Sequence, residues 1–169
     1  MSDLPVTILP AGPDDPDRLV ALIQAAFEEY RGLLNPPSSA HTQTPQRLLR
    51  EMADGGALIA LAGGEPAGCV LFHFRADHLY WDRLAVLPAF RRHGVGRALI
   101  AAVEDLARTR GYAQVRLSVR LEHARTRAYY ESLDYRFFAL GTHAGSSRPT
   151  YATLEKAVDD QSGPRMSAG

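Results

Sequence analysis

The sequence has few of the features that define several large classes of protein. Its one cysteine, Cys69, excludes a disulfide within the chain and a metal site built from several cysteines. No apolar run approaches the roughly 18 residues that a membrane-spanning helix needs. The first residues carry neither the basic start nor the apolar segment of a secretory signal. We therefore expect a cytoplasmic protein with no metal site and no membrane segment.

The length and composition are typical of one soluble domain. The chain has 169 residues, of which 46% are hydrophobic and 22% charged, and these fractions indicate a globular protein rather than a disordered or fibrous one. No internal repeat or interdomain linker interrupts the sequence. We expect residues 1–157 to form a single domain and residues 158–169, which are small and polar, to form a flexible C-terminal tail.

The formal net charge of zero conceals an uneven distribution. Between Arg83 and Arg127, ten arginines face three acidic residues, which gives a net charge of +7, and the rest of the chain carries nine basic and sixteen acidic residues. A basic stretch of this kind favours a polyanionic small molecule as ligand. Nucleic acid is the weaker hypothesis, because the whole chain is neutral and has no recognisable nucleic-acid-binding motif.

Hydrophobic periodicity predicts a mixture of strands and helices along the whole chain. The first helix should end near Gly32, and a second should start at the cap candidate Thr44 followed by Pro45. Helices are predicted at about 19–30, 44–53, 95–110 and 123–133, and strands at 6–9, 57–62, 67–74, 79–87, 114–119, 136–143 and 150–156.

A basic, glycine-containing loop joins the strand at 79–87 to the helix at 95–110. The first turn of a helix leaves backbone N–H groups without partners, and Gly94 and Gly96 allow a ligand to approach the backbone closely. The nearby Arg91, Arg92 and Arg97 add cations suited to phosphate oxygens. The loop therefore predicts a site for phosphate or pyrophosphate. The alternative is an ordinary surface loop; a generic nucleotide-binding loop is disfavoured because the Gly-Lys-Ser/Thr signature is missing.

Two motifs in this chain resemble the GNAT superfamily of N-acetyltransferases. Arg91-Arg-His-Gly-Val-Gly96 resembles the Arg/Gln-x-x-Gly-x-Gly/Ala signature of that family, and the segment Arg125–Tyr135 resembles its tyrosine-containing second helix. The predicted strand at 114–119 lies between the motifs, and the resemblance covers roughly residues 65–157. It implies an α/β (α+β) single-domain GNAT fold: a mixed central sheet of six to seven strands, with splayed central strands and about four flanking helices.

The resemblance also implies acetyl-CoA as the acetyl donor and direct transfer to a primary amine of a small molecule, protein or peptide. The cofactor-binding residues that it implies are Leu84, Ala85 and Val86 on the central strand, the loop residues Arg91, Arg92, His93, Gly94, Val95, Gly96 and Arg97, and His123 and Tyr130. His123 stands where many members have an asparagine, and Asp134 stands where glycine usually ends the helix; aspartate tolerates the left-handed conformation needed there.

Candidates for proton transfer and acceptor binding come from other parts of the chain. Tyr130 occupies the motif position of the general acid, with a packed core residue as the alternative, and its neighbour Tyr129 is expected in the core. Asp82 is a candidate base, amine anchor or structural ion-pair partner. Glu28 and Glu29 are candidate acceptor-binding residues or solvated surface charges.

Other polar features have plainer interpretations. We expect His73 to be a satisfied core or face residue and Cys69 to pack as a small apolar side chain. The loop 143–150 is a hairpin loop or one wall of the acceptor pocket. A non-catalytic acetyl-CoA-binding regulatory module is the alternative function. The oligomeric state stays open, with a homodimer among the alternatives.

Overall fold

A computed structural model describes residues 4–12 and 15–159 of the chain. Within those residues, seven strands form one mixed sheet in the order β1-β2-β3-β4-β5-β7-β6, accompanied by four α-helices. The α+β fold and the predicted order of elements are confirmed. The elements are β1 (Val6–Pro10), α1 (Pro16–Phe27), α2 (Pro45–Glu51), β2 (Gly55–Ala62), β3 (Glu65–Phe74), β4 (Leu79–Val86), α3 (Val95–Thr109), β5 (Gln114–Arg120), α4 (Ala124–Ser132), β6 (Arg136–Gly141) and β7 (Tyr151–Ala157).

The chain divides into two compact units, which are described one at a time. Unit 1 contains the described residues up to Phe74 together with 81–103, and unit 2 contains 75–80 together with 104–159. Strand β4 and helix α3 each contribute residues to both units. None of the helices in the described residues is long and apolar enough to cross a membrane.

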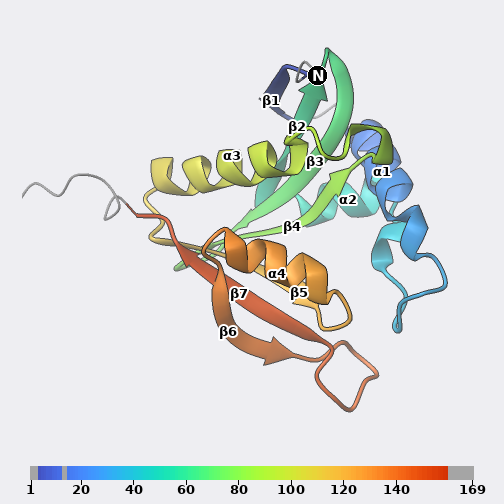
Figure 1. Cartoon of the computed structure of the whole chain (residues 1–169), viewed down its shortest axis with the longest axis vertical. Helices are drawn as coiled ribbons and strands as arrows, with labels where there is room; N and C mark the ends of the chain where they lie inside the picture. The colour runs from blue at the N-terminus through green and yellow to red at the C-terminus, as the bar shows by residue number, and fades with distance from the viewer. Residues whose placement is uncertain (1–3, 13–14, 160–169) are drawn as a thin grey trace, which may run out of the picture. The chain divides into compact units, whose positions relative to one another are not determined.

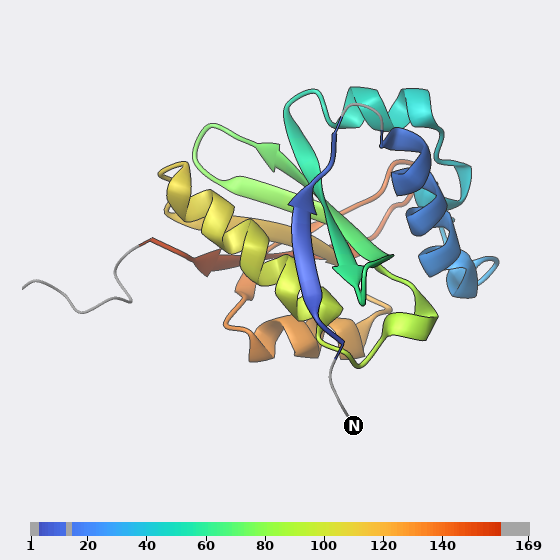
Figure 2. The same cartoon turned by 90° about the horizontal axis from the view of Figure 1, so that it is seen from above.

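Unit 1 is built on the antiparallel strands β1, β2 and β3. Helices α1 and α2 lie on one side of these strands, and the first part of α3 lies on the other (Figures 1 and 2). On α1, the apolar residues Leu19, Leu22, Ile23 and Ala26 recur at helical spacing and are buried, each larger side chain contributing about 1.5–3 kcal/mol by leaving water. This packing places the end of α1 beside the loop that follows β4.

The ends of the first two helices follow local chemistry. The α-helical part of α1 stops at Phe27 and continues as a 3-10 turn over Glu28–Tyr30, before Gly32 takes a left-handed conformation at φ 78°. The helix predicted to end near residue 30 is therefore an α-helix followed by a 3-10 turn. For α2, the predicted cap is confirmed, since the Thr44 hydroxyl accepts a 3.1 Å hydrogen bond from the Arg47 N–H.

Strands β3 and β4 approach closely where β3 carries a glycine. A Cβ atom added to Gly68 would lie 2.4 Å from the Ala85 carbonyl oxygen, so no larger residue fits without a backbone shift. Leu87, directly after β4, donates a 2.9 Å hydrogen bond from its N–H to the Ala67 oxygen of β3. This contact fixes the end of β4, from which the glycine-containing loop departs.

Unit 2 consists of β5, β7 and β6 with α4 lying along β5 (Figure 1). The start of β4 joins it through two parallel residue pairs, Leu79 with Val115 and Tyr80 with Arg116. Whether the central strands splay apart after those two pairs, as the sequence predicts, stays a prediction. Val158 follows β7, is buried, and donates a 2.8 Å hydrogen bond to the Ala113 oxygen. Most of the predicted flexible tail, 160–169, lies outside the described residues.

A buried carboxylate in unit 2 connects α3 with β7 and with the segment between α4 and β6. Glu104 of α3 is 6% exposed and accepts from the Tyr135 hydroxyl at 2.8 Å and from the Lys156 ammonium at 3.0 Å. Both carboxylate oxygens are therefore hydrogen-bonded, and the charge is compensated, as a buried carboxylate requires. The Tyr135 ring in turn contacts the ring of Tyr130 on α4, with centroids 6.3 Å apart.

Candidate active site

The loop between β4 and α3 presents a run of backbone donors. After a 3-10 turn at Pro88–Phe90, Arg92 and Gly94 adopt positive φ angles of 67° and 78°, and α3 then begins at Val95. Within the described part of the chain, the backbone N–H groups of residues 92–97 have no hydrogen-bond partner. No atom lies within 4 Å of the position that a Cβ of Gly94 would take. Unpaired donors at a helix start, with open space beside them, fit an anion.

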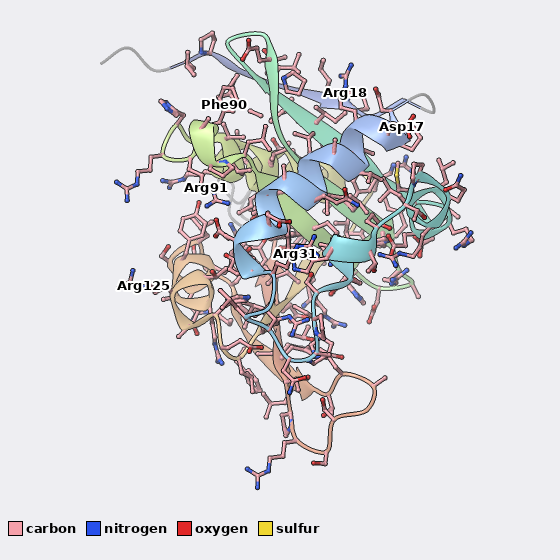
Figure 3. The ribbon with its side chains drawn as sticks, turned by 90° about the vertical axis from the view of Figure 1, so that its right-hand side faces the viewer. Asp17, Arg18, Arg31, Phe90, Arg91 and Arg125 are labelled. Atoms are coloured by element: carbon pink, nitrogen blue, oxygen red, sulfur yellow. The ribbon has the colours of Figure 1, made fainter. Side chains whose placement is uncertain are left out.

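The three arginines of this loop have different surroundings. All three guanidinium nitrogens of Arg91 are engaged: Nη1 pairs with Glu29 at 2.6 Å, Nη2 donates to the Ala26 oxygen and Nε to the Val86 oxygen, each at 3.2 Å. Arg91 thus lies against the end of α1 (Figure 3). Arg92 and Arg97 are exposed and have no hydrogen bond or ion pair with any described residue. Neither side chain would have to break such a contact to bind an anion.

Strand β4 departs from extended geometry at its centre. Arg83 has φ 53°, a left-handed conformation that costs a non-glycine residue about 1–2 kcal/mol. Its guanidinium donates a hydrogen bond to the Ser39 hydroxyl. Such strain persists only where the surroundings impose it, and it is concentrated at functional sites. The residues that follow are the three predicted to bind the cofactor, of which Ala85 is buried and Leu84 and Val86 are partly buried.

Asp82 belongs to a cluster of three ionisable side chains in unit 1. Its Oδ1 lies 2.9 Å from Nε2 of His73 on β3, and Nδ1 of His73 lies 2.9 Å from Oδ1 of Asp54. Burial opposes a charge on His73, but the hydrogen bonds and charges of Asp82 and then Asp54 outweigh it, so the pKa of His73 is raised. The sequence indicated a satisfied His73, which is confirmed. Its partners lie 9 and 19 residues away, and no local pattern marks them.

The two glutamates predicted for acceptor binding both form ion pairs within unit 1. Glu28 pairs with Arg31 at 2.9 Å, and the hydrogen bond from Arg31 lowers the pKa of the Glu28 carboxyl. Glu29 pairs with Arg91. Both carboxylates remain about half exposed, and their role in acceptor binding stays a prediction. At Glu29, an acceptor amine would compete with Arg91 for the carboxylate.

Tyr130 packs against aromatic neighbours in unit 2. It is 8% exposed and lies between the rings of Tyr129 and Tyr135, with centroids 5.9 and 6.3 Å away. The expectation that Tyr129 is a core residue is wrong, because its side chain is 41% exposed. The turn of about 100° between neighbouring helical residues brings one tyrosine into the interior and leaves the other at the surface.

The two departures from the family motif have clear local settings. His123 directly precedes α4, where its side chain makes no capping hydrogen bond, and burial lowers its pKa. Asp134 has φ 75°, so the predicted left-handed conformation is confirmed. Cys69 is fully buried, and burial raises the pKa of its thiol to about 12, which suits the predicted role as a small apolar side chain.

Comparison with protein-family models identifies the family of this chain. The model of the acetyltransferase (GNAT) family matches residues 19–135, more than half of the chain. The chain belongs to this family. It is an acetyl-CoA-dependent N-acetyltransferase.

Individual relatives agree with the family assignment. A thialysine N-epsilon-acetyltransferase of Caenorhabditis elegans is 28% identical over 137 residues, which cover 76% of this chain and 81% of the relative. The ribosomal-protein-S18-alanine N-acetyltransferase of Escherichia coli has the same fold, with a TM-score of 0.72 at 22% identity over 92% of this chain and 95% of that chain. The PaiA N-acetyltransferase of Thermoplasma acidophilum, solved with coenzyme A, also has a TM-score of 0.72, at 18% identity over 91% of this GNAT chain and 99% of its own.

Proposed function

We propose that this GNAT enzyme acetylates a primary amine that carries positive charge, with Asp82 as the residue that receives it. The observation that supports the proposal is the placement of Asp82 on β4, directly before the strained Arg83 and the strand residues that the family resemblance assigns to the cofactor. Asp82 is 37% exposed at its side chain, so an acceptor can reach it. A carboxylate at this position attracts the ammonium form and can accept a proton from it.

Donor binding is assigned to the loop and to β4. The backbone N–H groups of residues 92–97, with Arg92 and Arg97, hold the pyrophosphate. The backbone of Leu84, Ala85 and Val86 binds the pantetheine arm, and a β4 N–H polarises the thioester carbonyl. His123 contributes a further contact to the cofactor. Acetyl-CoA supplies an acyl group already activated as a thioester.

Two proton movements complete the transfer. Asp82 removes a proton from the acceptor ammonium, and the neutral amine nitrogen then attacks the thioester carbon. The new N–C bond replaces the C–S bond, and the departing thiolate takes a proton from the Tyr130 hydroxyl. The amide nitrogen loses its remaining extra proton to solvent, Asp82 releases the proton that it took from the ammonium, and Tyr130 is reprotonated from solvent. No acyl-enzyme is required.

The relatives suggest which acceptors to test first. One relative is named for the ε-amine of thialysine and another for an alanine of ribosomal protein S18. An amino-acid side-chain amine and a peptide amine are therefore the two acceptor classes to compare. The partly exposed Asp82 carboxylate favours an acceptor that has a positive charge near neutral pH.

The test begins with thermal unfolding in the presence of acetyl-CoA, coenzyme A, ATP or NAD at equal concentration. A ligand at a hundredfold its dissociation constant stabilises the native state by about 2.7 kcal/mol. We expect a raised midpoint with acetyl-CoA and coenzyme A only, and thiol release when thialysine, lysine or an alanyl peptide is added. Cofactor binding without thiol release from any amine would instead support the regulatory module.

We also propose a cytoplasmic homodimer. The sheet order ends at β6, an edge strand on which Phe137, Phe138 and Leu140 are 52%, 48% and 53% exposed. Apolar side chains on an unpaired edge favour association with another chain. Light scattering after gel filtration distinguishes a dimer from a monomer, and Phe137→Ser with Leu140→Ser should shift the distribution toward monomer.

A further inference from the structure

On strand β3, His73 interrupts an apolar run. From Cys69 to Phe74 the strand reads Cys-Val-Leu-Phe-His-Phe, and His73 is 6% exposed. Its two ring nitrogens point to carboxylates on either side, Asp82 on β4 and Asp54 between α2 and β2, each at 2.9 Å. Hydrophobic burial alone does not require a charged group here.

The geometry favours a protonated ring. A neutral imidazole has one N–H, so it can donate to one of the two carboxylates and would turn a lone pair toward the other at 2.9 Å. Two donations require the imidazolium.

The ion pair also leaves part of Asp82 available. The hydrogen bond from His73 goes to Oδ1, and Oδ2 has no hydrogen bond within the part of the chain that the structure describes. A carboxylate held at one oxygen by a buried ring loses rotational freedom before the substrate arrives. Asp54 is 46% exposed at its side chain and holds the ring from the opposite side.

We infer that His73 is a positioning residue, which orients Asp82 so that its second carboxylate oxygen meets the acceptor amine. This role rests on the proposed function of Asp82. It goes beyond that function by assigning acceptor recognition to a three-residue unit, Asp54–His73–Asp82, in which the ring holds the carboxylate that meets a cationic amine. A stability role alone is a poor explanation, since buried ion pairs are often no more stabilising than apolar residues of similar size.

The test is a double-mutant cycle on the amine kinetics. We compare the wild type with His73→Gln, Asp82→Asn and the double variant. The first quantity is kcat/KM toward an amine that the wild type acetylates, and the second is the dissociation constant of coenzyme A. We expect His73→Gln to lower kcat/KM about tenfold or more, to leave coenzyme A affinity within twofold, and to have no further effect in the Asp82→Asn background. His78→Gln, which removes another histidine–carboxylate pair at 2.7 Å, is the matched control and should retain wild-type kinetics.

Each outcome is decisive. Equal losses from His73→Gln in both backgrounds, or a loss of coenzyme A affinity, would overturn the positioning role. A wild type that releases no thiol with any amine would overturn the proposed function and this role together, whereas an active wild type matched by His73→Gln overturns the role of His73 alone. If His73→Gln does not fold, Asp54→Asn replaces it, with a smaller loss expected in the same constant; an unchanged constant would then refute the inference.

Discussion

Replacing Arg91 tests which arginines of the proposed cofactor loop stabilise the fold and which bind coenzyme A. It belongs to the family signature, yet its guanidinium is bound within unit 1 to Glu29, the Ala26 carbonyl and the Val86 carbonyl. We predict that Arg91→Ala lowers stability and leaves coenzyme A affinity nearly unchanged. Arg92→Ala should do the reverse, because Arg92 has no hydrogen bond or ion pair with any described residue.

The magnitude follows from the contacts. The Arg91–Glu29 pair joins side chains that are 39% and 43% exposed, so it contributes at most about 0.5 kcal/mol. The two hydrogen bonds to carbonyl oxygens contribute about 1 kcal/mol each. The sum of about 2 kcal/mol should lower the midpoint of thermal unfolding by about 4–8 °C in a chain of this size. Glu29→Gln, which removes the ion pair alone, should lower it by about 1–2 °C.

The assay pairs thermal unfolding with titration of coenzyme A for each variant. For Arg92→Ala we expect an unchanged midpoint and an affinity lower by roughly tenfold or more, since a charge-assisted hydrogen bond contributes about 1.5–3 kcal/mol. The argument fails if Arg91→Ala weakens coenzyme A binding as much as Arg92→Ala while its unfolding midpoint stays at the wild-type value.

Two further changes test unit 2. Tyr130→Phe should lower kcat at least tenfold with little change in coenzyme A affinity, and steady-state kinetics with unchanged turnover would remove Tyr130 from the mechanism. Lys156→Met should destabilise the protein by about 3 kcal/mol, because it leaves the buried Glu104 carboxylate without its compensating charge. Denaturant unfolding measures that loss, and a variant as stable as the wild type would show that Glu104 is neutralised in another way.

The elements and the loop could be predicted because their signals are local. Apolar spacing defines α1 and its buried face, and the cap at Thr44 follows from two adjacent residues. Gly94 takes the positive φ expected of a glycine in that loop. Asp134 does the same at the end of α4 because the chain must turn there before β6.

The partners of the charged side chains could not be predicted, because they depend on tertiary packing. Arg91 and Glu29 are 62 residues apart in sequence, and His73 meets Asp54 across 19 residues. The positive φ of Arg83 also lacks a sequence signal, since arginine rarely adopts it. These features arise when strands and helices from different parts of unit 1 pack together.

The packing changes how the uneven charge should be interpreted. The basic stretch from Arg83 to Arg127 predicts a polyanion site, and the acidic excess elsewhere favours a cationic acceptor. In the structure, part of each excess compensates the other: Glu29 pairs with Arg91 in unit 1, and Glu155 pairs with Arg116 at 2.7 Å in unit 2. The net charges of the two parts of the sequence therefore overstate the support for both predictions. The evidence for the anion is the unpaired backbone of residues 92–97, and the evidence for a cationic acceptor is one carboxylate oxygen of Asp82.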